Sequence, residues 1–344
     1  MPVDKIRVEG DKRIKYESAL LNGRKYGYLL SQPQSGKWRG TIFLIHGFPD
    51  LSMGWRYQIP MLVNMGLRVV APDCLGYGRT DAPEDYTKYG HKACADDIKA
   101  LASHLGESKI ILGGHDWYVK FKLYKLRWIY TKMTRGAFLA YRVALWYPDL
   151  VTHLFTVCVP YSSPKKEYLP LEEMVRTIMP NYGYQLQFAS GELEKVVKSK
   201  EEIKQFLTAL YGGRTPEKEI GFEAEKGILL DHLMKLKHSR LLSEEELEYY
   251  GTEFSRNGVR GPLNWYRTRK LNYEDELSII GRRITVPTLF IQALRDTALP
   301  PHLGKAMGKQ IPGLILKQID TAHWALWERP EEVNAIISAW LKGV

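Results

Sequence analysis

Short runs of β-branched and other apolar residues alternate with helical patterns along most of this 344-residue chain. A run such as 41–45 is too short for a helix, and its lack of polar alternation is typical of a strand buried on both faces. The pair Asn22-Gly23 separates the first two runs and is typical of a hairpin turn. Strands alternating with helices predict an α/β fold, a mainly parallel sheet with helices on both faces. The predicted strands span 16–21, 25–31, 41–45, 67–71, 109–113, 154–159, 288–292 and 314–319, and the predicted helices span about 91–105, 136–147, 303–310 and 331–342.

One long segment departs from this alternation. Residues 161–275 are rich in Glu, Lys, Leu and Tyr, and their apolar residues recur at helical spacing without intervening strands. The segment lies between two of the predicted strands, so we expect a helical cap inserted into the α/β unit. The expected division is a core formed by 1–160 and 276–344, with the cap at 161–275.

The composition indicates a globular protein, because 44% of the residues are hydrophobic and 26% are charged. No uncharged apolar run reaches about 18 residues, so the sequence predicts no stable membrane insertion. The first 15 residues are polar and lack the apolar region of a secretory signal. Cys74, Cys94 and Cys158 are odd in number and widely spaced, without the spacing of a metal site. We interpret them as reduced thiols of a cytoplasmic protein.

The formal net charge is +10, but much of it lies in one unusual segment. Residues 118–135 carry six Lys or Arg side chains, no acid and five aromatics, and removing those six charges leaves +4. Basic residues interleaved with aromatics suit single-stranded nucleic acid or a membrane surface. Either partner would depend on this segment alone, so we expect no nucleic-acid partner.

The end of the strand at 109–113 carries the most informative motif, Gly113-Gly114-His115-Asp116-Trp117. Small residues before a nucleophile allow the sharp strand-to-helix turn of α/β-hydrolases, and here the nucleophile position holds Asp116. A carboxylate attacks a saturated carbon and forms an alkyl-enzyme ester. This chemistry suits opening an epoxide or displacing a halide, and it does not suit a serine esterase or lipase. Taken alone, Asp116 could instead be a helix N-cap.

Further polar residues follow other predicted strands. The loop His46-Gly47-Phe48-Pro49 comes after the strand at 41–45, and the backbone N–H groups of Phe48 and Trp117 could stabilise an oxyanion. Asp296 follows the strand at 288–292, and His323 follows the strand at 314–319. The order nucleophile, acid, histidine is that of the α/β-hydrolases, with each group at the carboxyl end of a strand.

With these motifs the sequence resembles the epoxide hydrolase family of the α/β-hydrolase fold, from about residue 10 to 342. The resemblance includes PDCLGYGRTDAP at 72–83 and two tyrosine motifs in the cap, YQLQF at 184–188 and NWYR at 264–267. In this family a tyrosine of each motif donates a hydrogen bond to the epoxide oxygen, which implies that role for Tyr184 and Tyr266. It also implies an eight-stranded, mostly parallel sheet with a helical cap.

The implied reaction converts an apolar epoxide and water into a vicinal diol in two steps. Asp116 would attack a ring carbon while the two tyrosines hold the oxygen, and Trp117 would line the substrate site with them. His323, oriented by Asp296, would then activate water against the ester. The N–H groups of Phe48 and Trp117 would stabilise the tetrahedral intermediate. Neither a metal nor an organic cofactor is implied.

The sequence departs from the family directly after the nucleophile. A small residue is expected two positions beyond Asp116, but Tyr118 stands there, and family-like sequence resumes only at Gly136. Joining Trp117 to Gly136 restores the pattern, so 118–135 is an 18-residue insertion. One hypothesis is a retained intron, because the codons permit splice-like ends; the other is a genuine surface loop. We expect the insertion to impair activity.

Two other functions remain as alternatives. A haloalkane or haloacid dehalogenase would share the Asp nucleophile and the His-Asp pair. Haloalkane dehalogenases typically place a halide-binding Asn where Phe48 stands, and the two tyrosine motifs favour an epoxide. The second alternative is a non-enzymatic protein of the α/β-hydrolase fold whose nucleophile turn is disrupted.

Overall fold

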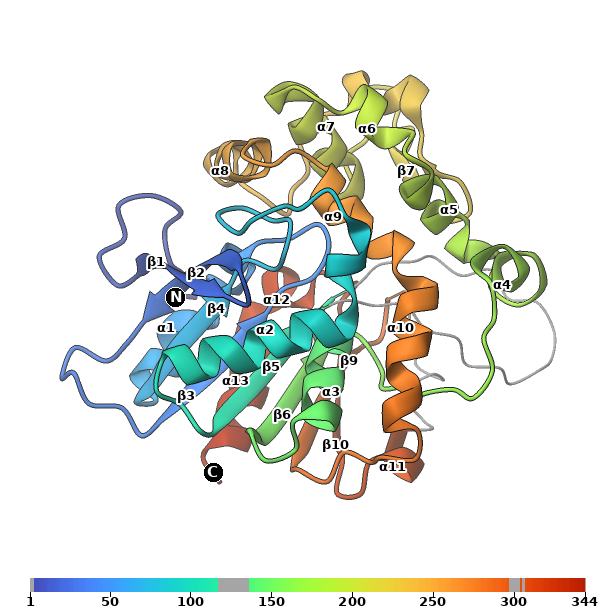
Figure 1. Ribbon diagram of the computed structural model, residues 1–344. Coiled ribbons are helices and arrows are strands. Elements are labelled where there is room, and N and C mark those ends of the chain that lie inside the picture. The colour runs from blue at the N-terminus through green and yellow to red at the C-terminus, as the bar shows by residue number, and fades with distance from the viewer. Residues whose placement is uncertain (1–2, 117–135, 297–303, 305–306, 344) are drawn as a thin grey trace.

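The computed structural model describes residues 3–116, 136–296, 304 and 307–343. The described residues form an eight-stranded sheet in the order β1-β2-β4-β3-β5-β6-β9-β10 (Figure 1). Strand β2 pairs antiparallel with β1 and β4, and all the other pairs are parallel, which confirms the predicted fold class. The strands are β1 (Lys15–Leu21), β2 (Arg24–Ser31), β3 (Gly40–Ile45), β4 (Leu67–Pro72), β5 (Ile110–His115), β6 (Val151–Val157), β9 (Thr288–Ala293) and β10 (Ile315–Ile319), beside a separate pair, β7 (Phe222–Glu223) and β8 (Gly227–Ile228).

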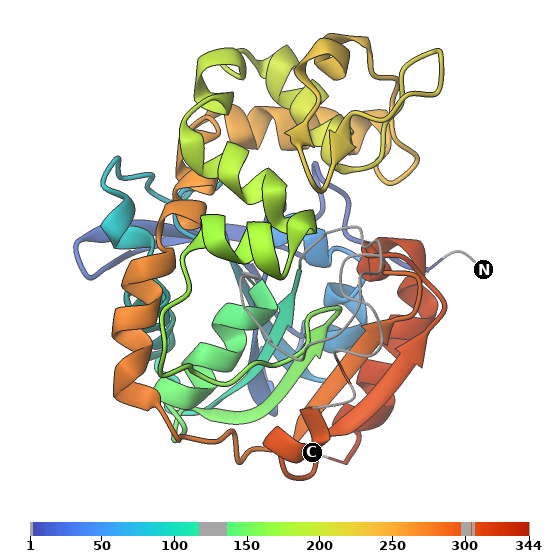
Figure 2. The same ribbon diagram turned by 90° about the vertical axis from the view of Figure 1, so that its right-hand side faces the viewer.

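Helices cover both faces of the sheet. Helices α2 and α3 pack together on one face, and α1 packs against α13 on the other (Figures 1 and 2). Strands β4, β5 and β9 are buried along their whole length, as their continuous apolar sequences predict. The helices of the described residues are α1 (Ile59–Asn64), α2 (His91–His104), α3 (Gly136–Trp146), α4 (Leu171–Thr177), α5 (Gly183–Ser190), α6 (Leu193–Val196), α7 (Lys200–Leu210), α8 (Glu244–Ser255), α9 (Arg260–Asn264), α10 (Arg269–Glu276), α11 (Met307–Gln310), α12 (Ala325–Glu328) and α13 (Pro330–Leu341).

Most predicted elements are present, with small shifts at their ends. The hairpin turns at Asn22 and Gly23, whose φ angles of 47° and 80° lie in the left-handed region. Strand β5 extends two residues beyond its predicted end, because Gly114 and His115 still pair with β6. Of the helix expected at 303–310, the structure shows α11, while 297–303 and 305–306 lie outside the described residues.

Residues 161–275 contribute no strand to the large sheet. Helices α5 to α9 lie above it, over the carboxyl ends of its parallel strands (Figure 1). Helix α10 runs instead along the side of the sheet and packs against α2. No described helix has both the length and the hydropathy that a membrane-spanning segment requires.

Candidate active site

Three polar side chains from separate strand ends meet beneath the cap. Asp116 follows β5, Asp296 follows β9, and His323 follows β10. The His323 Nδ1 atom lies 2.9 Å from Oδ2 of Asp296, and its Nε2 atom lies 3.9 Å from Oδ1 of Asp116. The side chains of all three are about 1% exposed. The structure therefore brings together the nucleophile, the base and the acid expected from sequence.

The backbone around Asp116 is tightly constrained. Its φ angle is +132°, a conformation that side chains other than glycine rarely adopt. Its side chain lies directly on the backbone of Gly47, where an added Cβ would stand 1.7 Å from the Asp116 Cβ. Glycine is therefore required at position 47, because any side chain there would displace the carboxylate from the loop that follows β3.

The electrostatics of His323 are dominated by its two carboxylate neighbours. Burial by itself favours the neutral ring, but the charge of Asp296 and the neighbouring Asp116 outweigh it and raise the pKa of His323 to about 9. The ring is thus protonated at neutral pH.

Glu328 holds the loop that carries His323. One carboxylate oxygen accepts hydrogen bonds from the hydroxyl of Thr321 and the backbone N–H of Ala322, both at 3.1 Å. The other oxygen accepts the backbone N–H of Trp324 at 3.0 Å. Glu328 therefore binds the backbone on both sides of His323. Sequence reasoning missed it, because an acid at the end of the short helix α12 carries no distinctive pattern.

The loop after β3 is held by a neutral histidine. Nδ1 of His46 lies 2.8 Å from the carbonyl oxygen of Gly47, and Nε2 accepts the backbone N–H of Cys74 at 2.9 Å. Burial lowers the pKa of His46 to about 4, so the ring stays neutral and serves this loop structurally. The loop continues into Phe48, one of the two expected oxyanion donors. The other, Trp117, lies outside the described residues, and so does the expected substrate contact of Trp117.

The two expected tyrosines come from the cap and lie side by side. Tyr184 is on α5, and Tyr266 is in the turn Trp265–Arg267 after α9. Their rings are 6.2 Å apart and nearly perpendicular, and the Tyr266 ring lies 5.3 Å from that of Phe48. The structure thus places Tyr266 against the loop on which Asp116 rests, with Tyr184 beside it.

A buried amide also contacts one of these phenols. Nε2 of Gln185 donates a hydrogen bond to the hydroxyl oxygen of Tyr184 at 2.7 Å. A phenol that accepts a hydrogen bond keeps its own proton available for donation. Sequence reasoning missed Gln185, although it stands next to Tyr184 in the YQLQF motif.

A cavity of about 540 Å³ leads from the surface to His323. It opens between cap residues 209–225 and the loop 322–328, and aromatic side chains of Tyr211, Phe222 and Trp324 line it. This volume is typical of small-molecule sites, and the lining favours an apolar ligand.

Cys158, Asp296 and His323 also have ligand atoms within 4.8 Å of one another. The Cys158 thiol, however, donates a hydrogen bond to the carbonyl oxygen of His323 at 3.1 Å, and burial raises its pKa well above the usual range. Hydrogen bonds among the described residues account for this cluster, because the thiol binds the His323 carbonyl and Asp296 binds the His323 ring.

Comparisons with known proteins agree with this fold. Residues 40–117 match the family model of the alpha/beta hydrolase fold, a match that ends directly before the segment 118–135. The chain is 39% identical to an epoxide hydrolase of Neurospora crassa over 332 residues, which cover 92% of each protein. It is 35% identical to bifunctional epoxide hydrolase 2 of Rattus norvegicus over 88% of its length, but it spans only 51% of that protein. A solved epoxide hydrolase structure from Vigna radiata superposes with a TM-score of 0.76 at 26% identity, covering 97% of this chain and 99% of the other.

Proposed function

The chain belongs to the epoxide hydrolases of the α/β-hydrolase fold, and from this premise we propose how its own residues open an epoxide and release a vicinal diol. The site residues are Asp116, Asp296, His323, Tyr184 and Tyr266, with the backbone N–H groups of Phe48 and Trp117 as oxyanion donors. The observation that carries the assignment is the position of His323 between two carboxylates, at 2.9 and 3.9 Å.

In the first step a carboxylate oxygen of Asp116 attacks a ring carbon of the epoxide. The carbon–oxygen bond of the ring breaks, and its electron pair stays on the oxygen. An alkoxide is a poor leaving group at neutral pH, so a phenol of Tyr184 or Tyr266 donates a proton to it. Phenols suit this role because they remain protonated at pH 7. The product is an ester between Asp116 and the opened substrate.

In the second step His323 acts as the general base. Esterification removes the negative charge of Asp116, which is one cause of the raised pKa of His323. The ring then gives up its proton more easily, and this proton returns to the phenolate left by the first step. The neutral imidazole takes a proton from a water that attacks the ester carbonyl. The N–H of Phe48 stabilises the resulting oxyanion. Collapse of this intermediate releases the diol and restores the Asp116 carboxylate.

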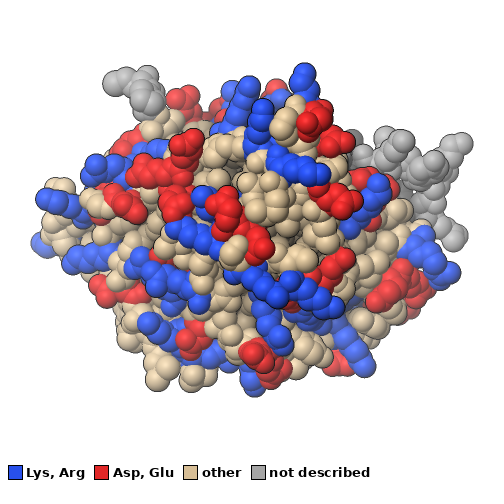
Figure 3. Space-filling view, turned by 90° about the horizontal axis from the view of Figure 1, so that it is seen from above, with Lys and Arg blue, Asp and Glu red and all other residues tan. Residues whose placement is uncertain are grey.

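We propose an apolar epoxide as the substrate, because aromatic side chains line the cavity that leads to His323. Lys and Arg are interspersed with Asp and Glu on the face of the molecule seen from above, which supports the proposal that it has no nucleic-acid partner (Figure 3). None of the three cysteines takes part in a disulfide, which supports a cytoplasmic location. The division into a core at 1–160 and 276–344 and a cap at 161–275 is supported by the placement of the eight sheet strands.

A single-turnover reaction in H₂¹⁸O, with enzyme in excess over an aryl epoxide, tests the mechanism. The proposed ester predicts that the first diol carries no label, because its new oxygen comes from Asp116, and that the label enters the peptide containing Asp116. Label in the first diol would show direct attack by water and would contradict the proposal. A haloalkane of the same skeleton is expected to release no halide, which separates this function from the dehalogenase alternative.

A further inference from the structure

Helix α8 presents one face of the cap to the core. It begins with a capping box in which Ser243 and Glu246 satisfy each other's backbone N–H groups. The buried residues Glu246, Tyr249, Tyr250 and Glu253 then recur at intervals of three and four, so they lie on one face of the helix. All four side chains reach partners in the core.

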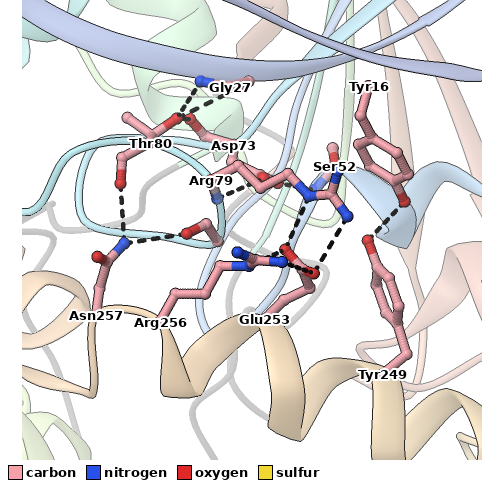
Figure 4. Close-up of polar contacts among 11 residues, drawn as sticks. Tyr16, Gly27, Ser52, Asp73, Arg79, Thr80, Tyr249, Glu253, Arg256 and Asn257 are labelled. Carbon is pink, nitrogen blue, oxygen red and sulfur yellow. Dashed lines mark hydrogen bonds and ion pairs between the residues drawn. The ribbon is translucent and has the colours of Figure 1, made fainter.

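The acidic residues of this face dock the helix to arginines of the core. Glu246 accepts a hydrogen bond from Nε of the fully buried Arg56 at 2.8 Å. Glu253 lies between Arg79 of the core and Arg256, the residue directly after its own helix, at 3.1 and 2.9 Å (Figure 4). These charge-assisted contacts hold α8 in one orientation.

The two tyrosines of this face form hydrogen bonds with different parts of the core. The hydroxyl groups of Tyr249 and Tyr16 are 2.6 Å apart, which joins α8 to β1 (Figure 4). The neighbouring Tyr250 instead donates a hydrogen bond to Oδ1 of Asp50 at 2.6 Å. A second cap tyrosine, Tyr211, donates to the carbonyl oxygen of Pro49.

Asp50 and Pro49 belong to the turn that carries Phe48. The backbone N–H of Asp50 donates to the carbonyl oxygen of Gly47 at 3.2 Å, which closes the turn around Phe48 and Pro49. Oδ1 of Asp50 also accepts the backbone N–H of Leu51 at 2.8 Å. A shift of the Asp50 carboxylate would therefore move the backbone N–H of Phe48, because both groups belong to one hydrogen-bonded turn.

We propose that Tyr250 and Tyr211 are positioning residues, which fix the turn 47–50 from the cap and aim the Phe48 N–H at the oxyanion of the second step. The proposal rests on the function given above. A hydrogen bond to developing charge matters most where that charge appears, which is in the tetrahedral intermediate formed from the ester. Loss of either phenol should therefore slow ester hydrolysis more than ester formation.

The charge state of Asp50 supports this role. Burial raises the pKa of Asp50 to about 7, and the hydrogen bond from Tyr250 opposes that rise. Without the phenol the carboxylate would lose its main stabilising partner from the cap. The contacts of Asp50 within the turn 47–50 would then weaken together with its contact to the cap.

The test compares Tyr250→Phe with Tyr249→Phe, a matched control. The two residues are adjacent on α8, and each change removes one hydroxyl group and one hydrogen bond between cap and core. Only the hydrogen bond of Tyr250 reaches the turn 47–50. Rapid quenching followed by intact-mass analysis measures the formation and decay of the ester. We expect Tyr250→Phe to form the ester within about 2-fold of the parent rate but to hydrolyse it about 10- to 100-fold more slowly, since loss of a whole oxyanion donor costs 10²- to 10³-fold.

Tyr249→Phe is expected to leave both rates unchanged, and Tyr211→Phe is expected to follow Tyr250→Phe. Equal slowing of both steps in Tyr250→Phe, or the same selective slowing in Tyr249→Phe, would overturn the proposal. Hydrogen exchange of the amides at 46–56 gives a readout that needs no turnover, and it should speed up in Tyr250→Phe alone. If neither the full chain nor the chain without 118–135 forms ester or diol, the proposed function fails, and the exchange rates still decide whether Tyr250 holds the turn.

Discussion

Nε2 of His323 stands 3.9 Å from Oδ1 of Asp116, and both side chains are almost completely buried. This distance is longer than a hydrogen bond but within the range of an ion pair. The ring is therefore adjacent to the carboxyl group that forms the ester in the proposed mechanism. The same geometry allows the charge on Asp116 to control when His323 becomes a base.

Replacing His323 by Gln should separate the two steps. The nucleophile remains, so the ester forms, but the base that activates water is gone, and general-base catalysis is worth about 10²- to 10⁴-fold. Intact-mass analysis after mixing with an epoxide should show the protein heavier by the mass of one substrate. Asp116→Asn, as a control, should show no added mass. A His323→Gln protein that turns over at the parent rate would remove His323 from the mechanism.

Removing either phenol should slow ester formation. Tyr184→Phe and Tyr266→Phe each delete one donor to the developing alkoxide, and a hydrogen bond to a charged group is worth about 1.5–3 kcal/mol, or about 10- to 100-fold in rate. The measurement is the rate of ester formation in a rapid-quench experiment. Tyr182→Phe is the matched control, because this buried tyrosine lies 6.3 Å from Tyr184 but has no proposed contact with substrate. Equal rates in all three variants would argue against acid assistance by these tyrosines.

Glu328→Gln should loosen the loop that carries His323. The amide keeps one acceptor oxygen, whereas the carboxylate accepts three donors through two oxygens. We expect kcat to fall about 10-fold and KM to fall with it, because slower ester hydrolysis lowers both constants and leaves kcat/KM nearly unchanged. Glu331→Gln, in the exposed first turn of α13, should have no effect on either constant. A change confined to KM would assign Glu328 to substrate binding instead.

Deleting residues 118–135 should increase epoxide hydrolysis. An added Cβ on Gly136 would stand 2.2 Å from the carbonyl oxygen of His115, so α3 begins close enough to Asp116 for the single residue Trp117 to join them. A displacement near 1 Å in such a site costs on the order of 100-fold in rate. Diol formation from an aryl epoxide by the two purified chains measures the difference. Replacing 118–135 by a Gly/Ser segment of equal length should not restore activity, and equal activity of the full and shortened chains would show that the insertion is tolerated.

The raised pKa of His323 should also make the free energy of unfolding decrease at alkaline pH. Its pKa is about 9 in the folded protein, above the ordinary value of 6.5, so the folded state holds the extra proton between these values. The extra proton contributes fully to the free energy of unfolding below pH 6.5. This contribution is lost as the pH rises towards 9, at about 1.4 kcal/mol per pH unit. Urea unfolding at pH 6.5, 7.5 and 8.5 measures the slope. In His323→Gln this contribution should vanish, and a slope equal to that of the parent would contradict the assigned pKa.

The sequence could predict the triad because each member follows an apolar run that forms a strand. Asp116, Asp296 and His323 stand at the carboxyl ends of β5, β9 and β10, and parallel strands bring such ends to one edge of the sheet. Their mutual distances and burial needed the structure, because side-chain geometry leaves no trace in residue spacing.

Other features of the site had no local signal. Glu328 acts through backbone N–H groups of the preceding loop, and Tyr250 acts on Asp50 although 200 positions separate them. A tyrosine on an amphipathic helix predicts burial but not a partner in another part of the fold. The oxyanion role of Trp117 and the insertion at 118–135 fall outside the described residues, so they stay predictions.

The order of strands in the sheet has a consequence for biosynthesis. Strands β6 and β9 are neighbours, although residues 158–287 separate them in the chain, and β10 completes the edge. Translation therefore produces Asp116, the proposed nucleophile, well before His323, the proposed base. A product truncated before β10 would keep Asp116 without His323, so any ester that it formed would persist, whereas the finished chain can regenerate itself.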